Sequence, residues 1–249
     1  MSRSPARPRS ARAARRPAAS PDGELVRAEV RTLLRDAATP AQLGTLAAVF
    51  VLDLLNLKLL PSGDAASRDV VHGLQAGLGL FLVSALALRF AYPAVSTDGR
   101  AALLLRTLPV SPARHLLVRF AVRAVPALAL EARGFALFAA LAAAGVGALS
   151  ITALQLGLGA LFPRYDAPNP VSVALGPGGL VAMALSALLA LAPVPIVSEG
   201  LRSLLETLLG TRVPGGPLLA AWAVVSAALA GGAMRAAARR LPRADLSAG

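Results

Sequence analysis

Long apolar stretches without charge limit what this chain can fold into. One of them covers residues 134–162, where twenty-nine consecutive positions carry no acidic or basic side chain. A helix of about 20 apolar residues is long enough to cross the hydrocarbon core of a bilayer. Of all residues, 56% are hydrophobic and only 15% are charged, too few charges to cover a soluble domain of this length. The sequence therefore predicts an all-α integral membrane protein.

About six apolar stretches are predicted to be transmembrane helices. The third is the weakest, because it contains Arg119, Arg123 and Pro126 and ends before Glu131. The fourth is longer than one crossing requires, so we expect it to tilt or bend. The predicted spans cover residues 42–60, 73–92, 115–130, 134–162, 178–197 and 217–234.

Composition divides the chain into four predicted parts. The first has six arginines and no acidic residue, so we expect a disordered basic arm. In the second, Val26, Val30 and Leu33 recur at helical spacing beside a row of arginines, which predicts a cytoplasmic amphipathic helix in the membrane interface. A six-span domain and a cytoplasmic tail follow. The four parts are residues 1–20, 21–40, 41–235 and 236–249.

The distribution of basic residues predicts the orientation of the spans. If the N-terminus is cytoplasmic, twenty of the 25 basic residues fall on the cytoplasmic side and five on the other. Basic residues accumulate on the cytoplasmic side of membrane proteins. We therefore expect a multi-pass protein of a cell membrane, the inner membrane in a bacterium, with both termini in the cytoplasm. The net charge of +12 then requires no nucleic acid as a partner.

Several kinds of chemistry are not expected. The chain has no cysteine, and its two histidines, His72 and His115, lie far apart in sequence, so we predict no metal, cofactor or catalytic site. A P-loop needs a lysine that reaches the nucleotide phosphates, but the single lysine, Lys58, lies inside the first predicted span. We therefore predict that the chain is not an enzyme and that any ATP-driven function requires an ATPase on a separate partner.

Three polar residues of the first predicted span, Asp53, Asn56 and Lys58, are candidate functional residues. Ionisable groups at membrane depth are costly and commonly face a cavity or a partner. The alternative is structural: Lys58 extends to the interface and Asn56 bonds to a neighbouring helix.

The segment PAVSTDGRAALLLRTLPVSPARHLLVR, at residues 93–119, is predicted to lie in the cytoplasm. Its apolar run could form a short helix on the membrane surface that docks a soluble partner, or it could be an ordinary interfacial loop. The candidate docking residues are Asp98, Gly99, Arg100, Arg106 and Pro109.

The segment FPRYDAPNP, at residues 162–170, should end the fourth span, because its prolines cannot continue a helix. We expect a rigid turn in which Arg164 and Asp166 can pair and Asn169 bonds to local backbone. The alternative is a solvated loop. The residues of the predicted turn are Phe162, Pro163, Arg164, Asp166, Asn169 and Pro170.

These segments resemble a bacterial family of ABC exporter permeases of the second exporter type. YPAVSTDGR followed by LLRTLPVSPARHLLVRF is similar to a loop of that family, as are FPRYDAPNP, the NLK of the first span and the N-terminal segment LVRAEVRTLLRDAATPAQ. Asp98 stands where the family usually has glutamate, and the resemblance is to the C-terminal half of permeases about twice this length.

The resemblance implies a permease subunit or half-subunit of an ABC exporter. Its partners would be a separate ABC ATPase, docked on the 93–119 segment, a second permease half or second copy, and the lipid membrane. The alternative is a membrane anchor or regulatory protein that transports nothing, including a truncated or decayed permease.

Overall fold

A computed structural model describes residues 21–35, 64–99, 111–131, 138–167, 169–212 and 214–241, together with positions 44, 45, 47–49, 51, 52 and 55. All regular secondary structure in these ranges is helical, and none of the described residues lies in a strand. The predicted all-α fold class is therefore confirmed for the part of the chain that the structure describes.

The described helices differ widely in length. Their bounds are α1 Pro21–Arg35, α3 Ala65–Phe90, the 3-10 turns η1 Tyr92–Ala94 and η2 Ser96–Asp98, α5 Pro112–Glu131, α6 Phe138–Leu161, α7 Pro170–Ala174, α8 Pro177–Leu191, α9 Val194–Val197, α10 Glu199–Leu209 and α11 Gly215–Arg240.

Local sequence explains where several helices begin and end. The Asp64 side chain accepts a hydrogen bond from the Ser67 N–H at the start of α3. The Ser198 side chain accepts one from the Leu201 N–H at the start of α10. Both are ordinary N-cap residues. Gly210 ends α10 in the left-handed conformation at φ 66°, which glycine adopts without steric cost.

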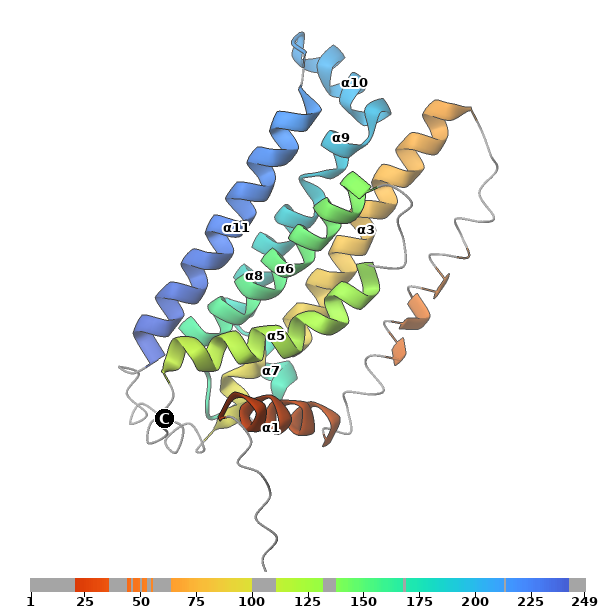
Figure 1. The fold of residues 1–249 in the computed structure, drawn as a ribbon. Helices are drawn as coiled ribbons and strands as arrows, with labels where there is room; N and C mark the ends of the chain where they lie inside the picture. Colours follow the sequence, from red (N-terminus) through yellow and green to blue (C-terminus); the bar gives the residue numbers. More distant parts are fainter. Residues whose placement is uncertain are drawn as a thin grey trace, which may run out of the picture.

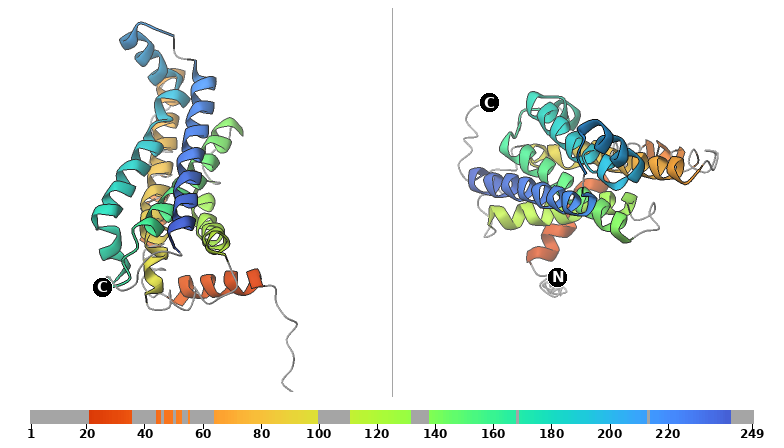
Figure 2. Two further views of the ribbon diagram at one scale, coloured as in Figure 1. Left: turned by 90° about the vertical axis from the view of Figure 1, so that its left-hand side faces the viewer. Right: turned by 90° about the horizontal axis from the view of Figure 1, so that it is seen from above.

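The long helices run side by side and the short amphipathic helices lie at the two ends. Figure 1 shows α3, α6, α8 and α11 as neighbouring helices, with α1 lying across one end and α10 at the other. We refer to these as the α1 end and the α10 end. The turned views in Figure 2 show that α1 lies across the long helices and not along them. The ends of α3, α6 and α11 and the start of α5 all lie at the α1 end (Figure 1).

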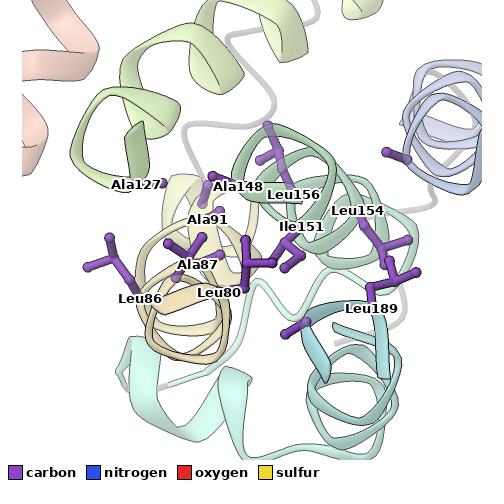
Figure 3. Close-up of a cluster of buried hydrophobic side chains, with 14 of the residues drawn as sticks. Leu80, Leu86, Ala87, Ala91, Ala127, Ala148, Ile151, Leu154, Leu156 and Leu189 are labelled. Carbon is purple, nitrogen blue, oxygen red and sulfur yellow. The ribbon is translucent and has the colours of Figure 1, made fainter. Parts of the chain in front are cut away.

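The core is centred on α6, which packs against α3, α5, α8 and α11. Figure 3 shows this cluster, in which Ile151 and Leu154 of α6 lie with Leu80 of α3 and Leu189 of α8. Ile151 is completely buried. The Trp222 indole N–H of α11 also donates a hydrogen bond of 3.0 Å to the Leu189 carbonyl, which satisfies its polar group inside the bundle.

Two glycines allow α6 to approach its neighbours closely. A Cβ atom at Gly157 would lie 2.8 Å from the Ala233 backbone of α11. A Cβ atom at Gly159 would collide with the Tyr92 carbonyl oxygen of η1. Small residues at such crossings let helix backbones pack against one another in membrane proteins.

Among the described residues, four helices are long and apolar enough to cross a membrane: Asp69–Ala94, Ala143–Leu161, Pro177–Val197 and Gly215–Arg240. They overlap the second, fourth, fifth and sixth predicted spans. The first predicted span falls mostly outside the described residues. The third coincides with α5, which does not meet these criteria. The count of six therefore remains a prediction.

The outer faces of these helices are apolar. The span in α6 is 67% buried inside the fold, but the span in α11 is only 17% buried. Leu180, Leu188, Val224 and Val225 are among the large apolar side chains that stay more than half exposed. Such extended apolar surface is rare on a soluble monomer and normally contacts lipid or protein.

Candidate functional site

Four charged side chains meet at the α1 end and form what we call the charge cluster: Glu29, Asp98, Arg119 and Arg123. They come from α1, from η2 and from α5. Glu29, Arg119 and Arg123 are only 7%, 5% and 8% exposed. Charged residues are rarely buried to this extent unless they are paired, so the contacts within the cluster hold these three elements together.

The two arginines lie on one face of α5 because they are four residues apart. Arg123 Nη2 lies 2.5 Å from Glu29 Oε1, and its Nε donates to the same oxygen at 3.1 Å. Arg119 Nε lies 3.4 Å from Glu29 Oε2, while its Nη2 lies 2.5 Å from Asp98 Oδ1. Glu29 of α1 therefore pairs with both arginines of α5, and Arg119 also pairs with Asp98 of η2.

The same arginines bond to backbone carbonyls of the last residues of α3 and of η1. Arg119 Nη1 donates to the Ala94 carbonyl at 2.7 Å, and Arg123 Nη1 donates to the Phe90 carbonyl. The last carbonyls of a helix have no partner inside that helix, and cations near a helix C-terminus are favourable. The guanidinium groups therefore satisfy these carbonyls and fix the end of α3 against α5.

The cluster has two acidic and two basic groups, so its formal charges cancel. Burial by itself would raise the pKa of Glu29, but the attraction of Arg119 and Arg123 outweighs it, and the pKa is lowered from 4.5. Glu29 is therefore ionised at neutral pH. A buried pair of this kind need not add net stability, but removing one partner leaves an uncompensated buried charge.

Of the predicted docking residues, the structure describes Asp98 and Gly99. Asp98 pairs with Arg119 inside the fold. Gly99 ends η2 at φ 48°, and its N–H donates to the Ser96 carbonyl, a conformation that L-residues with a side chain rarely adopt. Arg100, Arg106 and Pro109 lie outside the described residues, as do the intramembrane candidates Asp53, Asn56 and Lys58.

The predicted turn after the fourth span lies beside η2. α6 ends at Leu161, directly before Phe162 and Pro163. The Arg164 N–H donates a hydrogen bond of 2.9 Å to Ser96 Oγ, and Ser96 is 5% exposed. This bond ties the turn to the loop that carries Asp98.

The remaining turn residues start α7. Asn169 Oδ1 accepts a hydrogen bond of 2.8 Å from the Ser172 N–H, and Pro170 is the first residue of α7. Asp166 is exposed. Between these described residues, the structure has no ion pair that joins Arg164 to Asp166; Arg164 Nη1 instead lies beside Gly176, 3.1 Å from where a Cβ would be.

From the sequence we did not predict Glu29, Arg119, Arg123 or Ser96 as site residues. The available signal was the spacing of Arg119 and Arg123, two cations one helical turn apart in an apolar stretch. That spacing predicts a shared acidic partner but does not show which one.

The fold and the cluster define a class: an all-helical protein with apolar outer faces and a neutral, buried charge cluster at one end. A family model described as "Putative ATP-binding cassette" matches residues 12–246. The chain belongs to this family. No curated protein and no solved structure matches the chain.

The family assignment corrects the prediction of an exporter permease. The resemblance to permeases rested on short motifs in loops, whereas the family model covers nearly the whole chain and describes an ATP-binding cassette. The predicted roles of exporter permease and permease half-subunit are therefore wrong. The alternative of a membrane anchor or regulator that transports nothing gains no clear support from this match.

The prediction that the chain is not an enzyme, with its ATPase on a separate partner, is overturned by the same match. That prediction rested on the absence of other catalytic motifs and, for ATP, on the absence of the sequence G-x-x-x-x-G-K-[ST]. This sequence does not occur in the chain, whose only lysine is Lys58. No group of three or more metal-ligating side chains occurs among the described residues.

Proposed function

We propose that this chain is a membrane-inserted member of an ATP-binding cassette transport system and works together with partner subunits. The observation that carries the proposal is the exposed apolar surface of four helices long enough to span a bilayer. The family assignment supplies the transport context. Exposed apolar faces of this extent need lipid or protein against them.

The proposal extends to orientation, with the α1 end in the cytoplasm. Arg89 is in the last turn of α3, and Arg239 and Arg240 are in the last turn of α11. Arg114 is in the first turn of α5, and Arg164 follows α6. All these helix ends lie at the α1 end (Figure 1), and basic residues favour the cytoplasmic side. In the six-span arrangement that we propose, both termini are cytoplasmic.

In this arrangement α1 lies along the cytoplasmic surface of the membrane. Val26 and Val30 of α1 remain partly exposed, at 39% and 37%, which suits a helix at a lipid interface. The charge cluster then joins this surface helix to α5 and to the end of α3, so that a displacement of α1 would be transmitted to the membrane helices. We propose this mechanical connection as the role of the cluster.

Membrane insertion is tested by alkaline carbonate extraction of membranes from cells that express the chain. We expect the chain to remain in the membrane pellet together with a known multi-pass protein. Recovery in the supernatant with peripheral proteins would contradict the proposal. Affinity purification in mild detergent, with the partners identified by mass spectrometry, then tests the transport context.

Nucleotide binding is the second measurement, because the family description refers to ATP. Without a P-loop lysine, phosphates would have to be held by arginines and backbone N–H groups. Photolabelling of the purified chain with an azido analogue of ATP, in competition with ATP, measures this directly. Saturable labelling would show that this chain is the nucleotide-binding subunit. The position of the labelled peptide in the sequence would then identify the binding site.

A further inference from the structure

A groove of about 430 Å³ opens between α3, α7 and α8. Its walls are mostly apolar and include Phe81 and Leu88 of α3, Leu175 directly after α7 and Met183 of α8. Its volume is within the range of pockets that hold small ligands. The groove is separate from the charge cluster, and neither the family assignment nor the proposed function gives it a role.

One cation borders this apolar groove. Arg89 lines it, is exposed, and belongs to the last turn of α3. The described residues contain no carboxylate within ion-pair distance of Arg89, in contrast to Arg119 and Arg123, which are neutralised by the cluster. The groove thus joins an apolar wall to a positive charge that no described carboxylate neutralises.

A second cation lies close by. The Arg164 guanidinium lies beside Gly176, the residue that follows the groove residue Leu175. Arg89 is in the last turn of α3 and Arg164 follows α6, and both helices end at the α1 end, where α7 also lies (Figure 1). Under the proposed orientation this is the level of the cytoplasmic headgroups, where basic pockets between helices bind anionic lipid headgroups.

We propose that this groove binds an anionic phospholipid of the cytoplasmic leaflet. The acyl chain lies against Phe81, Leu88 and Met183, and the phosphate pairs with Arg89. This inference rests on the proposed membrane insertion. Carbonate extraction tests insertion separately, so an inserted protein without bound lipid would overturn the lipid site alone.

The test uses the full chain in vesicles of phosphatidylcholine and phosphatidylglycerol in equal amounts. After extraction in mild detergent, native mass spectrometry counts the phospholipids that remain bound. We expect the wild-type chain to retain phosphatidylglycerol in preference to phosphatidylcholine. Arg89→Gln should weaken this retention about fivefold, the effect expected for one basic residue near an anionic lipid. Arg89→Lys keeps the charge and should largely restore it.

Two further variants separate the groove from general surface charge. Ala85 is exposed and lines the groove, so Ala85→Phe should fill it and displace the lipid. Arg239→Gln removes a cation from the end of α11 and should leave retention unchanged. Equal retention by wild type, Arg89→Gln and Ala85→Phe would overturn the proposal. The proposal would also be overturned if the wild-type chain forms a dimer and Ala85→Phe dissociates this dimer while phosphatidylglycerol stays bound. In that case a second copy of the chain would fill the groove.

Discussion

Glu29 is the single acidic residue by which α1 holds both arginines of α5. Its carboxylate contacts Arg119 and Arg123 with different oxygens. Arg119 has a second acid in Asp98, whereas Arg123 pairs with Glu29 and with a carbonyl oxygen. Loss of the Glu29 charge therefore affects Arg123 most.

We expect Glu29→Gln to destabilise the protein by about 3–5 kcal/mol, because it leaves a buried arginine without a counter-charge. Thermal unfolding of the purified protein in detergent measures the effect as a lower Tm. Glu24→Gln is the matched control: Glu24 is on the same helix and pairs with Arg27, but its side chain is 57% exposed. That exposed pair should contribute at most about 1 kcal/mol. Equal Tm values for the two variants would show that the cluster does not hold α1.

Gly159 is a second position where a small change should have a large effect on stability, because its missing side chain lets α6 approach η1 closely. Gly159→Ala should lower stability by about 1–3 kcal/mol, because the added methyl group would meet the Tyr92 carbonyl oxygen and force the helices apart. Gly145→Ala, on the same helix, is the control, since nothing lies within 4 Å of its added Cβ. The measurement is the yield of monodisperse protein together with its Tm. A Gly159→Ala protein as stable as Gly145→Ala would refute the close contact between α6 and η1.

At the scale of helices, ion pairs of Glu29 hold α1 against α5. The stability that these ion pairs provide should therefore depend on pH. The pKa of Glu29 is lower in the folded protein than its ordinary value of 4.5. The stabilisation that it provides is therefore complete above about pH 4.5 and is lost as the pH falls through the folded-state pKa. The difference in Tm between wild type and Glu29→Gln should be constant above pH 4.5 and shrink below it. A difference that does not change at acid pH would argue against this titration.

The short helix α7 depends on its N-cap. Asn169→Ala should cost about 1 kcal/mol, because it removes the hydrogen bond to the Ser172 N–H. Asp166→Ala, in the same turn but exposed, should change the Tm little. Both variants should keep any transport preference of the wild type, because we propose that this turn has a structural role. A changed substrate preference at wild-type stability would indicate a binding site there.

Hydropathy predicted the four long apolar helices that the structure describes, because a long run of apolar residues is visible in the sequence wherever the helix packs. The residues that join those helices were harder to predict. In the sequence, Arg119 and Arg123 only lowered the hydropathy of the third predicted span. Their role in holding α1 becomes clear once the structure places Glu29 beside them. That partner is distant in sequence, and no local pattern identifies it. The loop motifs indicated where the chain turns, but not that Ser96 would accept a hydrogen bond from Arg164.

At the scale of the whole molecule, orientation in the membrane can be measured directly. The chain has no cysteine, so a thiol reagent can label only the single cysteine that is introduced by mutation. Thr97 in η2 and Thr207 in α10 are both exposed and lie at opposite ends of the bundle (Figure 1). With intact cells, an impermeant maleimide should label Thr207→Cys, and Thr97→Cys should react only after permeabilisation. Labelling of both in intact cells would refute the proposed orientation.

The pair between Glu29 and Arg123 joins residues 94 positions apart in the chain. At a synthesis rate of about 5–20 residues per second, α1 leaves the ribosome roughly 5–20 s before Arg123 does. Throughout this interval the carboxylate has no buried partner and α1 has no α5 to pack on. The helix α1 is therefore made well before it can reach its final position against α5, and the nascent protein has a period in which chaperones or lipid headgroups can reach this face.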